Sequence, residues 1–119
     1  MPKSVPVTVV ETPEFLAVAR RIMDDEERAS LIGYLAQNPL AGNMVPGTGG
    51  VRKVRWALQG RGKSGGARVI YFFHNETMPL SALTVYAKKD RTNLSQAEPN
   101  DLRRLTALLV TSYARRTKR

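Results

Sequence analysis

The chain has 119 residues, no cysteine and a formal net charge of +9 at pH 7. This length predicts a single domain over residues 1–119 that buries a core without disulfide bonds or a structural metal ion. The lack of cysteine excludes a disulfide framework and thiolate chemistry. No apolar run approaches the roughly 18 residues of a membrane span, and the first residues lack a signal peptide's apolar segment. We therefore expect a cytoplasmic protein with no membrane partner.

The positive charge is concentrated in the later two thirds of the chain. Residues 1–40 hold four Lys or Arg against six Asp or Glu, whereas residues 41–119 hold fifteen against four. This asymmetry predicts a face that binds a polyanion. The alternative is a basic surface that only keeps the protein soluble.

The first predicted elements are a short strand and a helix. Residues 7–10 are mostly β-branched, which favours a strand. Thr12 is a good N-cap, and Pro13 then occupies the first helical position. Apolar residues recur at helical spacing from Phe15 to Met23, so this helix has one buried stripe.

A second helix is predicted directly after the first. Asp24 and Glu27 form a capping-box pattern at its start, and Asn38 followed by Pro39 marks its end. Its apolar residues Leu31, Ile32 and Leu35 are expected to face inward.

The rest of the chain predicts a loop, three strands and a last helix. Residues 41–50 are rich in glycine and aperiodic, whereas residues 51–58, 67–73 and 80–87 read as strands joined by short connections, which favour antiparallel pairing. An amphipathic pattern around Leu102–Leu109 predicts the helix. The expected fold is α+β, with order β-α-α-β-β-β-α, an antiparallel-dominated four-stranded sheet and helices on one face only.

The stretch Gly62-Lys63-Ser64 matches the end of a nucleotide-binding P-loop. Such a loop needs a glycine at position 57 and a helix after it, but position 57 is alanine and a predicted strand follows. We therefore expect a hairpin loop that carries Arg61 and Lys63, and no nucleotide cofactor.

A cluster of cations and one phenol is predicted where the three strands lie side by side. Alternation places Lys53 and Arg55 on one face of the strand 51–58, and Arg68 opens the next strand. The residues expected within reach of one another, with no carboxylate among them, are Lys53, Arg55, Lys63, Arg68, Tyr86, Lys88 and Lys89.

This combination suits cleavage of an RNA phosphodiester by its own 2′-hydroxyl group. That reaction needs a base, an acid and positive charge on the phosphorane. Lysine near other cations has a lowered pKa, arginine offers a planar fork to phosphate, and tyrosine stacks on a base. No metal is needed, and the chain has one histidine only.

Each residue also has a simpler interpretation. Lys53 and Arg55 would be solubilising charges on an exposed strand, and Tyr86 an ordinary half-buried aromatic residue. Arg68 would pair with Glu76 or Asp90.

Four segments together resemble a known family: GTGGVRK at 47–53, GKSGGARVIY at 62–71, LTVYAK at 83–88 and LSQA at 94–97. They resemble the HigB-like branch of the RelE/ParE superfamily, the toxins of type II toxin-antitoxin modules. The resemblance implies a metal-independent endoribonuclease (an mRNA interferase) without cofactors. It would cut mRNA in the ribosomal A site until a HigA-like antitoxin covers it.

The resemblance also implies roles for the cations. Lys53 and Arg55 look like the family's cationic pair, Arg68 like its arginine on the next strand, and Lys88 or Lys89 like the cation that ends the last strand. The family's C-terminal catalytic tyrosine has no counterpart here after Lys89 except Tyr113, which the helical pattern places in the core. The lysines are therefore expected to transfer protons, with Tyr86 as a substitute candidate. The predicted catalytic residues are Lys53, Arg68, Lys88 and Lys89, and the predicted RNA contacts are Arg55, Arg61, Lys63 and Tyr86.

Two alternatives stay open at this point. ParE-type relatives share the fold but inhibit DNA gyrase, and a basic module could bind nucleic acid without any chemistry.

Overall fold

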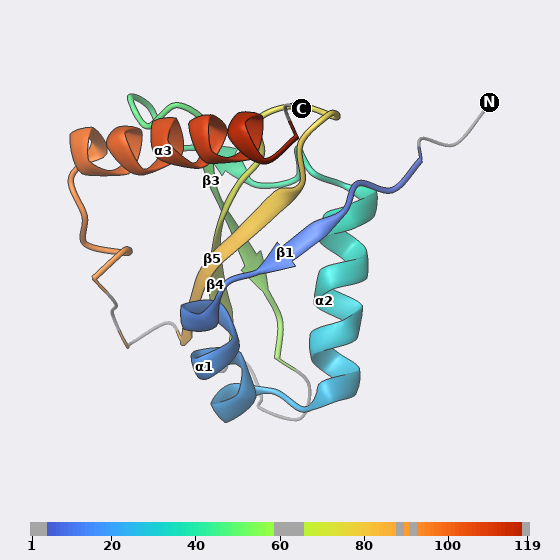
Figure 1. Ribbon diagram of the computed structural model, residues 1–119. Helices are drawn as coiled ribbons and strands as arrows, with labels where there is room; N and C mark the ends of the chain where they lie inside the picture. Colours follow the sequence, from blue (N-terminus) through green and yellow to red (C-terminus); the bar gives the residue numbers. More distant parts are fainter. Residues whose placement is uncertain (1–4, 59–65, 88–89, 91–92, 118–119) are drawn as a thin grey trace.

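A computed structural model of the chain describes residues 5–58, 66–87, 90 and 93–117. They form a five-stranded sheet with helices on both faces (Figure 1). The elements are β1 (Val9–Glu11), α1 (Pro13–Ile22), α2 (Asp25–Gln37), β2 (Asn43–Met44), β3 (Val51–Trp56), β4 (Ala67–Phe72), β5 (Leu80–Ala87) and α3 (Pro99–Thr117). The predicted α+β class is confirmed.

The strand order in the sheet is β1-β5-β4-β3-β2. β1 runs parallel to β5, and the other three pairs are antiparallel. The prediction of four strands is wrong, because β2 forms within the glycine-rich segment that was expected to be a loop. This strand has two residues and pairs through Asn43 with Lys53 and through Met44 with Arg52.

Helix α1 begins at the predicted N-cap. The Thr12 hydroxyl oxygen accepts a hydrogen bond from the backbone N–H of Phe15 over 3.2 Å. The same hydroxyl lies 3.0 Å from the carbonyl oxygens of Ala82 and Leu83 on β5. One side chain therefore caps α1 and fixes it to β5, and Phe15 and Ala19 of this helix are fully buried.

Helix α2 also follows the prediction. The Asp24 carboxylate accepts from the backbone N–H of Glu27 over 2.8 Å, as an N-cap does. Leu31 and Leu35 are fully buried, in a core cluster that α2 shares with α1 and one face of the sheet.

Helix α3 covers part of the opposite face, so the prediction of helices on one face only is wrong. Leu102 packs with Val51, Ile70 and Phe72 in a second core cluster. Because these strand residues alternate with those of the first cluster, both faces of the sheet carry apolar side chains that need cover. None of the helices within the described ranges has the length and hydropathy that a membrane span requires.

Candidate functional site

The strand register brings four of the predicted site residues to one face of the sheet. Arg55 on β3 lies opposite Arg68 on β4, which in turn lies opposite Tyr86 on β5. Lys53 is two residues before Arg55 and faces the same way. Residues directly opposite on antiparallel strands have Cβ atoms about 5 Å apart, so these side chains are neighbours.

Lys53, Arg55, Arg68 and Tyr86 all line one cavity of about 390 Å³, which we call the basic pocket. Its remaining lining residues are Asn43, Met44, Val45, Pro46 and Val54. Among these described residues there are three cations, one phenol and no carboxylate. The pocket lies on the face of the sheet that α3 partly covers, at the part of this face that bears the cations.

The cations of the basic pocket remain available to a ligand. Arg55 is exposed, and Lys53, Arg68 and Tyr86 are half-buried. Within the described ranges, neither Glu76 nor Asp90 forms an ion pair with Arg68, although this pairing was the simpler alternative for that residue. The half-buried guanidinium group of Arg68, beside the exposed one of Arg55, suits a phosphate group, which guanidinium groups can bind in a bidentate manner.

Four other predicted site residues, Arg61, Lys63, Lys88 and Lys89, lie outside the residues that the structure describes. Their roles stay predictions. The strand β4 that follows the Gly62-Lys63-Ser64 stretch is present, in agreement with the argument against a P-loop.

One wall of the basic pocket was missed by the sequence prediction. It consists of Asn43, Val45 and Pro46, from β2 and the segment after it. The available signal was the apolar pair Met44-Val45 between the turn residues Gly42 and Pro46, which is too short to distinguish a strand from a loop. We call residues 43–46 the β2 wall.

The β2 wall is fixed at its C-terminal end. The backbone N–H of Val45 donates to the carbonyl oxygen of Val51 over 2.8 Å, and the Thr48 hydroxyl donates to the carbonyl oxygen of Val45 over 2.6 Å. The hydroxyl group of Thr106, on α3, lies 2.9 Å from the carbonyl oxygen of Thr48. Thr48 and Thr106 are both buried, so the bond between them is shielded from water.

The wall is fixed at its N-terminal end by a buried tyrosine. The Tyr71 hydroxyl donates to the carbonyl oxygen of Pro39 over 2.8 Å and accepts from the backbone N–H of Gly42 over 2.9 Å. Arg52 adds a hydrogen bond to the carbonyl oxygen of Gly42 over 2.7 Å. Burial raises the pKa of Tyr71 above its ordinary value of 10.0, so the hydroxyl keeps the proton that it donates.

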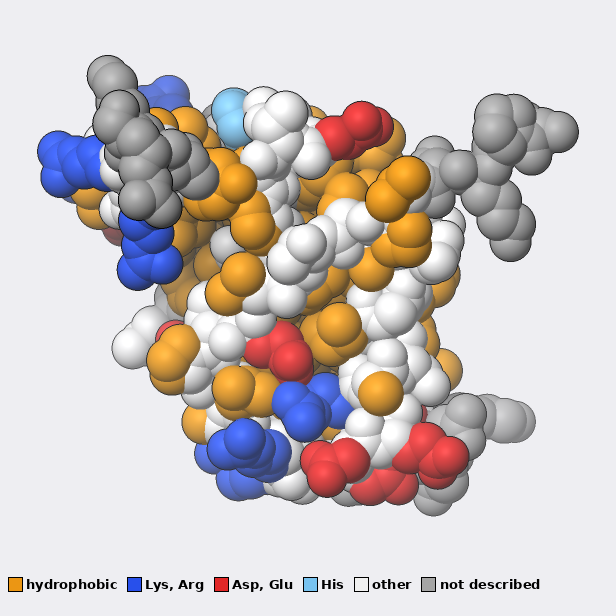
Figure 2. All heavy atoms as spheres, turned by 45° about the vertical axis from the view of Figure 1, so that its right-hand side comes forward, with side chains coloured by type: hydrophobic (Ala, Val, Ile, Leu, Met, Phe, Trp, Pro, Cys, Tyr) orange, Lys and Arg blue, Asp and Glu red, His pale blue; other side chains and the backbone are white. Residues whose placement is uncertain are grey.

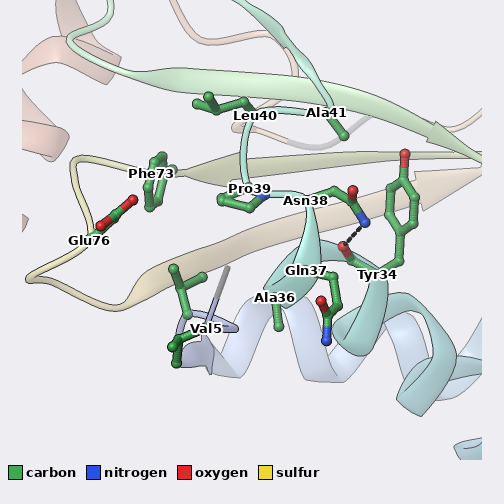
Figure 3. Close-up of a pocket in the computed structure, with 11 residues that line it drawn as sticks. Val5, Tyr34, Ala36, Gln37, Asn38, Pro39, Leu40, Ala41, Phe73 and Glu76 are labelled. Atoms are coloured by element: carbon green, nitrogen blue, oxygen red, sulfur yellow. Dashed lines mark hydrogen bonds between the residues drawn. The ribbon is translucent and has the colours of Figure 1, made fainter. Parts of the chain in front are cut away.

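A larger cavity of about 570 Å³ lies between the N-terminal segment and the end of α2 (Figure 3). Its lining is mostly apolar, with Tyr34 and Phe73 toward opposite ends, and Glu76 is its one charged lining residue among those described. None of the predicted site residues lines it. A cavity without cations does not suit a phosphodiester, so the smaller basic pocket is the better candidate site.

The opposite side of the molecule is acidic at one edge. Acidic side chains gather at the lower edge of the face that Figure 2 shows, and the first turn of α2 contains Asp25, Glu26 and Glu27. These carboxylates would repel a polyanion. Lys and Arg side chains lie beside them at this edge, and Arg28 forms ion pairs with Glu11 and Asp25. This mixture of charges contrasts with the basic pocket, whose described lining has no carboxylate.

The chain is similar to a known protein family over most of its length. A family model described as the RelE toxin of the RelE / RelB toxin-antitoxin system matches residues 10–118. The match spans β1 to α3 and includes every residue of the basic pocket.

Proposed function

We propose, from the premise that the chain belongs to the RelE toxin family, that it cuts mRNA in the A site of the ribosome. The family identifies the chain as the toxin of a toxin-antitoxin system and implies an antitoxin as its partner. Toxins of this family are typically endoribonucleases. The observation that carries the proposal is the basic pocket, which holds Lys53, Arg55 and Arg68 beside Tyr86 without a carboxylate among its described residues.

The proposed reaction uses the 2′-hydroxyl group of the RNA as the nucleophile. Its oxygen bonds to phosphorus while the bond from phosphorus to the 5′-oxygen breaks, leaving a 2′,3′-cyclic phosphate and a 5′-hydroxyl group. A base takes the proton of the 2′-hydroxyl group, and an acid supplies one to the 5′-oxygen. The extra negative charge on phosphorus must be stabilised while both bonds are partial.

The residues of the basic pocket match these needs. Arg68 lies beside Arg55, and together their guanidinium groups would bind the phosphate oxygens from one side. Lys53 would transfer one proton, and Lys88 or Lys89 the other. Tyr86 would stack on a base, and Arg61 and Lys63 would contact the RNA backbone.

The subtype is part of the same proposal. The segments at 47–53, 62–71, 83–88 and 94–97 support a HigB-like toxin with a HigA-like antitoxin. A toxin of this kind acts in the cytoplasm, where its ribosome and mRNA are, and uses neither a metal nor a nucleotide cofactor.

The test is cleavage of mRNA in a reconstituted translation reaction, with the 5′ ends of the RNA mapped. We expect cuts in translated mRNA and none in a matched sample of naked mRNA. Lys53→Ala and Arg68→Ala should each lower the cleavage rate about 100-fold or more, as loss of a proton-transfer or phosphate-binding group does. Arg21→Ala removes an exposed cation from α1, on the other face, and should cleave like the wild type.

Three results would count against the proposal. Equal cleavage of naked mRNA would show that the nuclease does not depend on the ribosome. Full activity of both pocket variants would show that the basic pocket is not the catalytic site. No cleavage with intact translation would favour the gyrase inhibitor, which a supercoiling assay would detect. The same result would also fit a module that binds nucleic acid without cleaving it. In such a module, the pocket variants lose affinity for nucleic acid and the salt dependence of binding together.

A further inference from the structure

We infer that Asn43 is a specificity-determining residue that reads a base of the RNA in the basic pocket. This inference rests on the proposed ribonuclease function and adds to it the group that selects the cleavage site.

The register places Asn43 next to the proposed chemistry. Asn43 on β2 lies directly opposite Lys53 on β3, so both side chains point to the pocket face. Its side chain lines the pocket and is exposed. Within the described ranges, the amide has no hydrogen-bond partner. Its donor and acceptor are thus open to a ligand.

Asn43 has a hydrogen-bonding ability that the cations lack. Lysine and arginine side chains only donate, whereas an asparagine amide donates and accepts at adjacent atoms. A base edge with an acceptor beside a donor can pair with such an amide through two hydrogen bonds. Phosphate contacts carry no sequence information directly, whereas contacts to base edges do, and this amide can make such contacts.

The distances across the sheet fit one nucleotide. Arg68 lies two strands away from Asn43, and adjacent strands are about 4.8 Å apart. A phosphate shared by Arg55 and Arg68 would lie about 7 Å from β2 across the sheet and about 7 Å from Asn43 along the strands. The resulting separation of roughly 10 Å is comparable with one nucleotide. The base would reach Asn43, with Val45 and Pro46 as apolar surface beside it.

The β2 wall is rigid enough to discriminate between bases. Tyr71 and Arg52 hold Gly42 on one side of Asn43, and Thr48 holds Val45 on the other. A Cβ atom at Gly42 would lie 2.7 Å from the carbonyl oxygen of Lys53, so only glycine allows this close approach of β2 to β3. An amide held in one place by such supports can distinguish hydrogen-bonding patterns.

The experiment maps cleavage sites in a reconstituted translation reaction on an mRNA that contains every codon. The proteins are the wild type, Asn43→Ala, Asn43→Gln and the control Asn100→Ala, which alters an exposed asparagine of α3. We expect the wild type to prefer certain bases at the cut. Asn43→Ala should lose about tenfold or more of this preference while it still cleaves, and Asn43→Gln, which keeps the amide, should retain the choice of base. Asn100→Ala should match the wild type.

The outcomes separate this inference from the proposed function. A wild type that never cuts overturns the proposed function. A wild type that cuts without base preference overturns the inference alone, as does an Asn43→Ala variant that keeps the preference. An equal loss of rate at every codon in both Asn43 variants also overturns it, because the residue would then act on the rate and not on the choice of base.

Discussion

Arg55 and Arg68 lie directly opposite each other on neighbouring antiparallel strands. Like charges in this arrangement repel each other and destabilise a sheet. The basic pocket is therefore formed against the stability of the fold, as is common for sites that serve a ligand.

The first prediction concerns this repulsion. Arg55→Gln should raise the free energy of unfolding by about 0.2–1 kcal/mol because it removes one of two opposed charges. The gain should shrink in high salt, which screens the repulsion, while mRNA cleavage falls. Urea unfolding at low and high salt measures the first effect. Arg21→Gln makes the same charge change on α1, and an equal gain in that variant would assign the effect to net charge instead.

The second prediction concerns the buried hydroxyl group of Tyr71. Tyr71→Phe removes its bonds with Pro39 and Gly42 and leaves a buried N–H group without a partner. The free energy of unfolding should fall by about 1–3 kcal/mol. Tyr34→Phe, which alters an exposed tyrosine of α2, is the comparison. A loss at Tyr71 below about 0.5 kcal/mol would mean that the β2 wall does not depend on this hydroxyl.

The third prediction is the pH dependence of the same group. Burial raises the pKa of Tyr71 in the folded state, so above pH 10 the unfolded chain loses this proton more readily than the folded one. Since stability falls with pH where the folded state binds more protons, the wild type should lose stability as the pH rises above 10. Other groups titrate in this range, so the measured quantity is the difference in unfolding free energy between wild type and Tyr71→Phe. That difference should shrink with rising pH, and a constant one would contradict the prediction.

The fourth prediction compares two glycines before β3. Gly47 and Gly49 have φ angles of 77° and 80°, which strain any side chain. A Cβ atom at Gly49 would also lie 2.7 Å from the Thr106 hydroxyl oxygen, whereas at Gly47 the nearest contact is an ordinary 3.6 Å. Gly47→Ala should therefore cost about 1–2 kcal/mol, and Gly49→Ala more. Thermal unfolding of both variants tests the order, and equal losses would mean that α3 moves aside at no cost.

The fifth prediction concerns the salt dependence of RNA binding. Each phosphate contact on single-stranded RNA contributes about −0.7 to the slope of log K against log salt concentration. Arg68→Gln should reduce the magnitude of this slope by about that amount, because it removes one such contact. Fluorescence anisotropy with a short RNA measures it, and Arg21→Gln should keep the wild-type slope. An unchanged slope in Arg68→Gln would place Arg68 away from the RNA backbone.

The parts of the fold that sequence could predict depend on local chemistry. Thr12 and Asp24 cap their helices through bonds to residues three positions later, which a short motif encodes. The common face of Lys53 and Arg55 follows from alternation along a single strand.

The parts that sequence could not predict depend on distant partners. β2 has two residues, and its position depends on Tyr71, which is 29 residues from Gly42 along the chain. The position of α3 depends on Thr106, whose contact with Thr48 spans 58 residues. No local pattern contains such contacts, so the β2 wall and the cover of the second face came from the structure.

The link from Thr12 to β5 also has a consequence for the order of events during synthesis. Thr12 contacts the carbonyl oxygens of Ala82 and Leu83, 70 and 71 residues later, and β1 pairs with β5 along the same stretch. The N-terminal strand and helix therefore cannot take their places on the sheet until β5 has left the ribosome that makes it. The nascent toxin therefore cannot complete its sheet before residue 87 has been made.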